Sequence, residues 1–141
     1  MRLKLNKNQS GFTLLEIIIV IIIIGILASL ALPKFFKTVE FSRSAEALGN
    51  LGSIRRAMDV CYQPKGTYAG TTPCDFPTLS ISDPSTNPNN HWSYAISGQT
   101  AIAYLITATR TTLDGGTIAD TIQIDQDGKK LGSGNFSQIK D

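Results

Sequence analysis

A single carboxylate inside a long apolar run is the residue of this chain whose chemistry most needs explaining. Glu16 is the only charged residue between Phe12 and Leu32, a run of apolar and small side chains. About 20 apolar residues in a helix cross a bilayer core, and an ionised side chain at that depth costs about 2.5–3.5 kcal/mol. The sequence offers no base between Gly11 and Lys34 to pair with it. We therefore expect Glu16 to be a functional group whose partner comes from elsewhere.

The residues ahead of the apolar run suggest that partner. Residues 1–10 contain three bases and no acid, and they lack an apolar stretch long enough for a secretory signal core. Cutting the chain after the small residue Gly11 would create a free amine on Phe12. By the positive-inside rule, the basic leader stays in the cytoplasm and the C-terminal part crosses the membrane. The alternative is an uncleaved signal anchor, with Glu16 tolerated near the membrane interface. The leader bases are Arg2, Lys4 and Lys7.

The segment SGFTLLE at residues 10–16, followed by the apolar run and Pro33, looks like the prepilin signature of type IV pilins and type II secretion pseudopilins. The resemblance covers residues 1–62 well and is only general beyond them. It implies that a prepilin peptidase cuts between Gly11 and Phe12 and methylates the amine of Phe12. It also implies that Glu16 pairs with the N-terminal amine of a neighbouring subunit during assembly.

The same resemblance implies the partners and the location of the chain. The partners are other copies of the chain and related pilins, the prepilin peptidase and methylase, the inner-membrane assembly machinery, and membrane lipid before assembly. The location is the bacterial inner membrane, with the C-terminus outside the cytoplasm, and then an extracellular pilus or a periplasmic pseudopilus.

Composition agrees with one small domain on a membrane helix. The chain has 141 residues and a formal charge of +2, but removing the three leader bases leaves a mature balance of about −1. The basicity therefore belongs to targeting, and no specific nucleic-acid partner is predicted. Residues 33–141 suffice for one modest core.

The apolar run is expected to be the first half of a long helix. Ile17 to Ile24 is an uninterrupted β-branched run that alone would favour a strand, but the full apolar length and the lack of turn residues before Pro33 favour a membrane helix. Pro33 removes one backbone donor, so a kink or local melting is expected there. An apolar stripe at three- and four-residue steps continues the helix to about Tyr62 and is expected to pack on the protein's own sheet. Its members are Ala47, Leu48, Leu51, Ile54, Met58 and Cys61.

The C-terminal part reads as loops and short antiparallel strands. Residues 63–90 are rich in turn formers, and alternating patterns predict strands at 92–96, 101–110 and 117–125, with a short last strand at 129–131. Asp127-Gly128 favours a two-residue hairpin turn. The resulting fold class is α+β and pilin-like: a long N-terminal helix whose second half packs on a small antiparallel sheet.

The two cysteines are predicted to form a disulfide. Cys61 and Cys74 lie on the translocated side, where oxidation is expected, and a bridge would stabilise the fold by roughly 3 kcal/mol in the chain-entropy model. A metal site lacks partners, because His91 is the only histidine. Many type IV pilins instead have a cysteine pair around a C-terminal loop, so the roles of that region are not transferred.

Other candidate sites are weak. Asp125 and Asp127 resemble half of a calcium loop, but no Glu follows at the required spacing, and the turn alone explains them. Major pseudopilins do bind calcium in a C-terminal loop, so this pair is kept as a minor candidate, and otherwise no metal and no cofactor are predicted. No catalytic triad, phosphate loop or carboxylate pair is recognisable, so no enzyme is predicted.

The sequence therefore predicts a filament subunit in four segments: a removed leader at 1–11, a transmembrane and assembly helix at 12–32, its continuation at 33–62, and a globular head at 63–141. The main hypothesis is a type IV pilin. The alternatives are a type II secretion pseudopilin and, from another class, a membrane-tethered periplasmic binding module that never polymerises.

Overall fold

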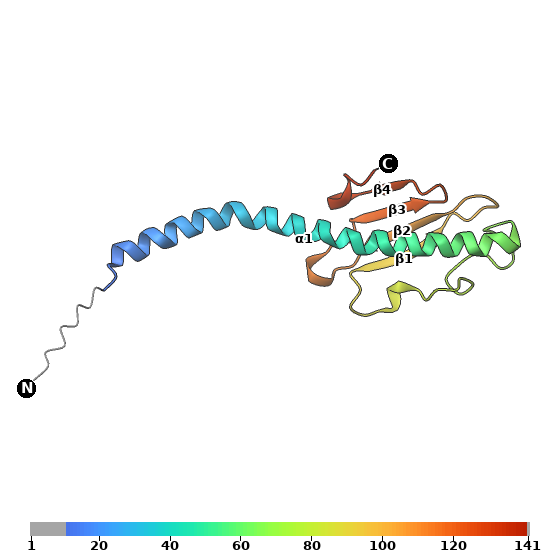
Figure 1. The fold of residues 1–141 in the computed structure, drawn as a ribbon, viewed down its shortest axis with the longest axis horizontal. Helices are drawn as coiled ribbons and strands as arrows, with labels where there is room; N and C mark the ends of the chain where they lie inside the picture. Colours follow the sequence, from blue (N-terminus) through green and yellow to red (C-terminus); the bar gives the residue numbers. More distant parts are fainter. Residues whose placement is uncertain (1–10, 141) are drawn as a thin grey trace, which may run out of the picture. The chain divides into compact units, whose positions relative to one another are not determined.

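The fold is one long helix followed by a small antiparallel sheet (Figure 1). The computed structural model describes residues 11–140, so the basic leader at 1–10 lies outside the described residues. The chain divides into two compact units at Phe36 and Lys37, and the core belongs to the second. The predicted α+β class is confirmed. In chain order the elements are α1 (Leu14–Lys65), η1 (Pro84–Thr86), β1 (Trp92–Ser97), β2 (Leu105–Arg110), η2 (Leu113–Gly115), β3 (Thr121–Asp125), β4 (Lys130–Gly132) and η3 (Gly134–Phe136).

Helix α1 runs without interruption for 52 residues, which includes the β-branched run that could have formed a strand. It passes through Pro33 as continuous helix, and the kink expected at that residue stays a prediction. The helix ends at Lys65, slightly later than the expected Tyr62. Gly66 follows with φ +64°, and its N–H donates to the Tyr62 carbonyl at 2.7 Å. A glycine in this left-handed conformation is a common helix stop.

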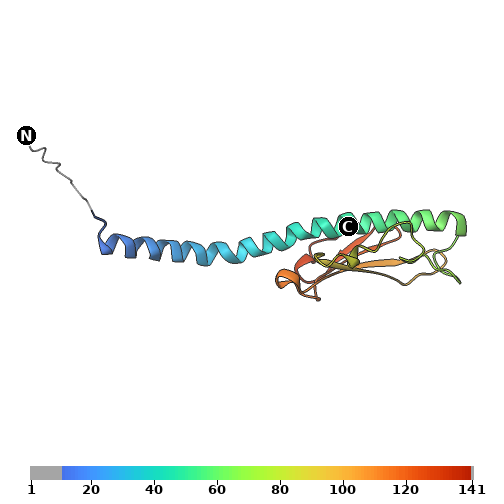
Figure 2. The same cartoon turned by 90° about the horizontal axis from the view of Figure 1, so that it is seen from below.

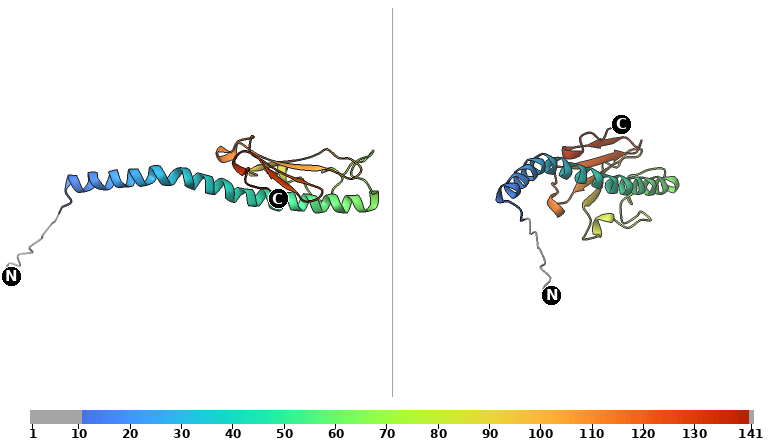
Figure 3. Two further views of the ribbon diagram at one scale, coloured as in Figure 1. Left: turned by 90° about the horizontal axis from the view of Figure 1, so that it is seen from above. Right: turned by 60° about the vertical axis from the view of Figure 1, so that its left-hand side comes forward.

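The sheet has the strand order β1-β2-β3-β4, and every neighbouring pair is antiparallel. The second half of α1 lies along one face of this sheet, so the head consists of two layers (Figure 2; Figure 3, left). The other face carries outward-pointing side chains such as Leu105 and Gln123, which alternate with buried neighbours.

Two strands begin later than predicted because local turns take their first residues. Strand β2 begins at Leu105 instead of 101, since the Ala103 N–H donates to the Thr100 hydroxyl at 3.0 Å and the Thr100 N–H donates to the Ala103 carbonyl at 2.9 Å. Strand β3 begins at Thr121 instead of 117, because the Asp120 N–H closes a turn on the Thr117 carbonyl at 3.0 Å.

The turn between β3 and β4 also differs from the prediction. Residues 126–128 form it rather than a two-residue loop, with Ile124 paired to Lys130 and Gly128 at φ +87°. The Asp125 carboxylate accepts the N–H groups of Asp127 and Lys129 at 3.0 and 2.9 Å. The Lys129 N–H thus bonds to the Asp125 side chain instead of to a strand carbonyl. The loop is therefore longer than the Asp-Gly pair alone suggests.

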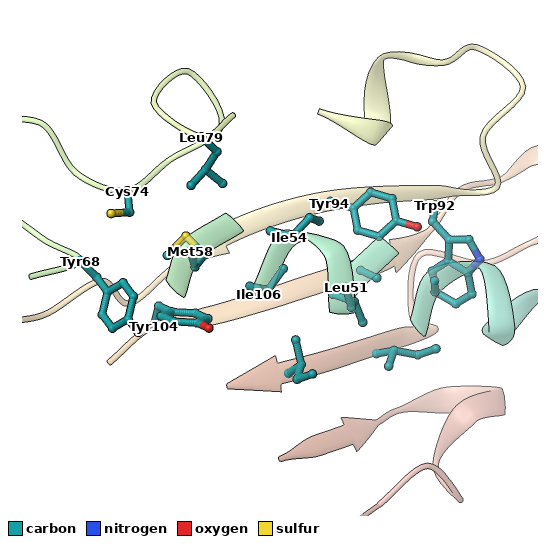
Figure 4. Packing of buried hydrophobic residues seen from close by; sticks show 14 of the residues in the cluster. Leu51, Ile54, Met58, Tyr68, Cys74, Leu79, Trp92, Tyr94, Tyr104 and Ile106 are labelled. Carbon is teal, nitrogen blue, oxygen red and sulfur yellow. The ribbon is translucent and has the colours of Figure 1, made fainter. Parts of the chain in front are cut away.

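The hydrophobic core fills the space between the second half of α1 and the sheet (Figure 4). The predicted helix stripe faces inward, with Leu51, Ile54 and Met58 fully buried and Leu48 partly buried. Burying each such side chain contributes about 1.5–3 kcal/mol. Ile118 has the same sequence parity as the buried Ile122 and Ile124, but it is 70% exposed because it lies in the turn before β3. The sheet contributes Trp92, Tyr94, Ile106, Ala108, Ile122 and Ile124 to the core.

Both edges of the sheet are covered by the chain itself. On β1, the N–H of Trp92 donates to the Asn90 side-chain oxygen at 3.2 Å, and the N–H of Tyr94 donates to the Ser85 hydroxyl at 2.8 Å. On β4, the N–H of Gly132 donates to the Ile139 carbonyl at 2.8 Å, beside a bridge between Leu131 and Lys140.

Candidate functional site

The first candidate site is the apolar surface of the N-terminal half of α1. Every large apolar side chain from Phe12 to Leu32 is exposed, including Phe12 at 81%. By length and composition α1 can cross a membrane. An exposed apolar surface of this length needs lipid or other apolar helices around it. This half of α1 is therefore built to be covered by something outside the described chain.

Glu16 lies in the first turn of this helix, just after the expected cleavage point. Residues 11–13 are not helical, so the bond between Gly11 and Phe12 lies outside α1. The Glu16 N–H donates to the Thr13 hydroxyl at 3.3 Å and to the Thr13 carbonyl at 3.1 Å, so Thr13 is the N-cap. The spacing of Thr13 and Glu16 is that of a capping box, a signal the sequence reading missed. Within residues 11–140 no salt bridge forms to the Glu16 carboxylate.

The second polar centre is a buried arginine in the head, which sequence reasoning did not find. Arg110 is 0% exposed, and all five of its N–H donors have acceptors. Its Nε and one terminal nitrogen donate to the two Glu40 oxygens at 3.0 and 3.3 Å. The remaining bonds go to the carbonyls of His91 (3.0 Å), Thr111 (3.1 Å) and Leu113 (3.0 Å). Arg110 thus joins α1 to the loop after β2.

A chain of further ion pairs extends this centre to the surface. Arg43 bridges Glu40 at 2.7 Å and Asp114 at 3.2 Å, and His91 contacts Asp114 at 3.0 Å. The hydrogen bond from Arg110 lowers the pKa of Glu40 despite its partial burial, and contact with His91 lowers the pKa of Asp114. The three-residue spacing of Glu40 and Arg43 on a helix is a signal that could have revealed their pairing, whereas the link to Arg110 depends on the fold.

Glycine is required beside Arg110. A Cβ on Gly116 would lie 2.1 Å from the Thr111 carbonyl oxygen and 2.6 Å from the Arg110 guanidinium carbon. Asp114 takes φ +52°, which is uncommon for a residue other than glycine. The loop at residues 111–119 is therefore held in one tight conformation around the guanidinium.

The predicted disulfide between Cys61 and Cys74 is confirmed, with Cα atoms 6.0 Å apart. It joins the last turns of α1 to the loop that follows. The Tyr62 and Tyr68 rings lie 4.6 Å apart beside it, and Tyr68 in turn packs against Tyr104. This end of the head is thus fixed by a covalent link and stacked aromatic rings.

The minor calcium candidates lie in the turn between β3 and β4. One Asp125 oxygen is already used by the two backbone N–H groups, and an Asp127 oxygen accepts from the Gln126 amide at 3.0 Å. The Arg55 guanidinium donates to the Gln126 carbonyl at 3.1 and 3.3 Å. Protein donors therefore already occupy one oxygen of each of the two aspartates. Among the described residues, no group of three or more His, Cys, Asp or Glu side chains could hold a metal ion.

Comparison with known proteins finds a family-model match in the N-terminal region and relatives that match part of the chain. Residues 6–32 match the family model of the prokaryotic N-terminal methylation motif. The type IV major pilin protein PilA of Myxococcus xanthus is 39% identical over 66 residues, which cover 47% of this chain and 30% of that protein. No solved structure matches the chain.

Two further relatives also match only part of this chain and part of their own length. The fimbrial protein EcpC of Eikenella corrodens is 44% identical over 45% of this chain and 42% of its own length. The type II secretion system core protein G of Aeromonas hydrophila is 37% identical over 47% of this chain and 46% of its own. The matched regions thus span less than half the length of each of these three relatives.

Proposed function

Because the chain belongs to the type IV pilin and pseudopilin family, we propose that it is a pilin, a structural subunit that polymerises into a surface filament after loss of its leader. The exposed apolar half of α1, with Glu16 as its only charge, is the observation that supports this proposal most strongly. In the membrane this surface is covered by lipid, and in a filament the same surface is covered by the helices of neighbouring subunits. The subunit acts by assembly and catalyses no reaction.

Processing prepares the chain for assembly. A prepilin peptidase removes residues 1–11 and methylates the amine of Phe12. The scissile bond lies ahead of the Thr13 cap, where the backbone is not helical. Glu16 then meets the new amine of an adjacent subunit, because an unpaired charge in an apolar bundle is costly. The pairing therefore sets the register between subunits.

The segments take different tasks in this proposal. Residues 12–32 form the inner-membrane anchor and the filament core, residues 33–62 continue the helix, and residues 63–141 complete a head outside the cytoplasm. Its partners are copies of itself, related pilins and the inner-membrane assembly machinery. Contacts that repeat in one direction without closing generate an open filament.

A type II secretion pseudopilin is the second candidate, favoured by the likeness to the type II secretion system core protein G. It would form a short periplasmic filament instead of a surface pilus. Electron microscopy of intact cells separates the two: filaments that extend from the surface at native expression support the pilin, and their absence together with a secretion defect on gene deletion supports the pseudopilin.

The processing step itself is tested by intact mass. In cells with a prepilin peptidase, the protein should begin at Phe12 and carry one methyl group, whereas Gly11→Leu should keep residues 1–11 and make no filament. Parent protein that retains Met1 to Gly11 in such cells would contradict the proposal and favour a tethered periplasmic module.

A further inference from the structure

The outer face of the sheet has a pocket of about 360 Å³ at the end where β2 begins and β3 ends. Leu105 and Leu131 form an apolar part of its lining, and both side chains point away from α1. Leu131 is 55% exposed, so its side chain is open to contact from outside the sheet. The remaining lining residues are Gln123, Asp125, Lys129, Lys130 and Lys140.

Positive charge surrounds this apolar floor. Lys129 and Lys140 are exposed, and within residues 11–140 neither makes a salt bridge. The one carboxylate in the lining, Asp125, is partly used by backbone N–H groups. The pocket therefore suits a partner that combines aliphatic side chains with a negative charge. With no aromatic ring in its lining, it offers no platform for stacking a sugar or a base.

The opposite end of the same sheet presents a surface of that kind. The loop at residues 111–119 carries Leu113 and Ile118, exposed at 39% and 70%. It also carries Asp114, whose side chain is 56% exposed; Arg43 and His91 both contact the same oxygen of this carboxylate, which leaves the other oxygen for a partner. The buried Arg110 holds this loop through two of its carbonyls. A loop held rigidly in this way loses little conformational entropy on binding.

The pocket and the loop cannot meet within one molecule. They lie at the two ends of β2, about 17 Å apart at about 3.3 Å per residue, and Figure 1 shows the loop and the β3–β4 turn at opposite ends of the sheet. The partner that fits the pocket is a second copy of this chain, offset along the strand direction. Two different patches that meet in this way form a head-to-tail contact, which propagates instead of closing.

We propose that loop 111–119 of one subunit docks in the lysine- and leucine-lined pocket of the next. Leu113 and Ile118 cover Leu105 and Leu131, and Asp114 approaches the ammonium groups of Lys129 and Lys140. The inference rests on the proposed function, since it describes one contact between heads in the filament. It adds to the helix bundle a second, head-level contact that fixes the axial neighbour of each subunit.

Cysteine cross-linking of assembled filaments tests the contact. Filaments sheared from cells expressing Ile118→Cys with Leu131→Cys should give, after mild oxidation, a ladder of dimers, trimers and higher multimers on a non-reducing gel, which collapses to monomer on reduction. Both positions are exposed, so the substitutions leave the core intact. The Cys61–Cys74 disulfide leaves no other thiol in the mature chain to react.

The controls separate this contact from other arrangements. Each single cysteine should stay monomeric, as should Val60→Cys with Leu131→Cys, because Val60 is exposed on α1 far from the loop. Dimers from Leu131→Cys alone would mean a two-fold contact and would overturn the proposal. If the parent chain forms filaments and the double variant gives no ladder, the proposed contact is wrong and the pilin function stands. If the parent chain forms no filaments, both proposals are wrong.

Charge reversal gives a second, independent measurement. Lys129→Glu with Lys140→Glu should lower the yield of sheared filaments several-fold while mature subunit accumulates in the membrane, because two carboxylates would then face Asp114. Lys129→Gln with Lys140→Gln, which removes the positive charge without reversing it, should lower the yield less. Unchanged filaments in the charge-reversed variant would contradict the proposed contact.

Discussion

Glu16 and Glu40 are carboxylates on the same helix, and their surroundings give them different roles. Glu40 meets Arg110 and Arg43 within its own chain, which lowers its pKa and fixes it in place. Glu16 has exposed apolar neighbours and, among the described residues, no salt-bridge partner. The first carboxylate stabilises the fold, and the second is expected to act between subunits.

Replacing Glu16 should block assembly without blocking insertion or cleavage. Glu16→Gln keeps the size of the side chain and removes its charge, and Glu16→Val should even ease insertion, yet both leave the amine of Phe12 buried without a partner. We expect mature subunit to accumulate in the membrane while sheared filaments disappear, measured side by side in the same cells. Parental filament levels in both variants would show that Glu16 has no part in assembly.

Replacing Glu40 should lower the free energy of unfolding and make that free energy less dependent on pH in the acid range. A carboxyl whose folded pKa lies below its unfolded value of 4.5 stabilises the fold above about pH 4.5, and that contribution is lost as the pH falls through the folded pKa. Glu40→Gln should therefore cost about 1–3 kcal/mol at pH 7, because it removes the charged acceptor of Arg110, and less once the pH has fallen through the folded pKa of Glu40.

Fluorescence of Trp92, the only tryptophan and fully buried, reports this unfolding in detergent-solubilised protein. Asp127→Asn, which changes an exposed carboxylate away from Arg110, is the matched control and should keep the parental pH profile. A loss of stability for Glu40→Gln that stays the same from pH 7 down to the acid unfolding of the parent would contradict an ionic contribution.

At the scale of the elements, the disulfide is the covalent link between α1 and the loop after it. Cys61→Ser with Cys74→Ser should lower the free energy of unfolding by about 3 kcal/mol. The reason is that the bridge closes a short loop, with a sequence separation of 13, and its loss returns conformational entropy to the unfolded chain. For a domain of this size that corresponds to roughly 10–20 °C in Tm. Reducing the disulfide of the parent protein should lower Tm by a similar amount. A fall in Tm of under 2 °C would mean that the aromatic contacts alone hold this end of the head.

The turn between β3 and β4 is not expected to bind calcium. Arg55 and the backbone already use the oxygens of Gln126 and Asp125, so millimolar Ca²⁺ or a chelator should leave Tm unchanged. Arg55→Ala should lower Tm, because the Gln126 carbonyl loses a charged donor worth about 1.5–3 kcal/mol. A rise in Tm with Ca²⁺ that Asp125→Asn abolishes would show instead that the turn is a metal site.

The sequence predicted the elements that follow from periodicity and failed where side chains act locally or at long range. The stripe through Leu51, Ile54 and Met58 showed both the helix and its buried face. The starts of β2 and β3 were wrong because Thr100 and Asp120 close turns that alternation cannot reveal. Arg110 looked like the end of a strand, and only the fold brings Glu40 to it from 70 positions away.

At the scale of the whole molecule, the core lies entirely in the unit that begins at Lys37. We expect a chain of residues 34–141 to be soluble without detergent and to unfold at the Tm of the mature chain in detergent, since none of the core residues is removed. It should also fail to enter filaments. A drop in Tm of more than 5 °C would show that the apolar half of α1 contributes to the stability of the head.

The covered sheet edges matter if the chain is a filament subunit, as proposed, because such subunits gather at high local concentration before they assemble. An unpaired strand edge is a template for adding strands from other molecules, and the end of that route is a cross-β aggregate. The side chains of Asn90 and Ser85 occupy the outward N–H groups of Trp92 and Tyr94, and the C-terminal segment closes the far edge. In the proposed filament, subunits can therefore assemble through their helices with little competition from amyloid-like pairing of their sheets.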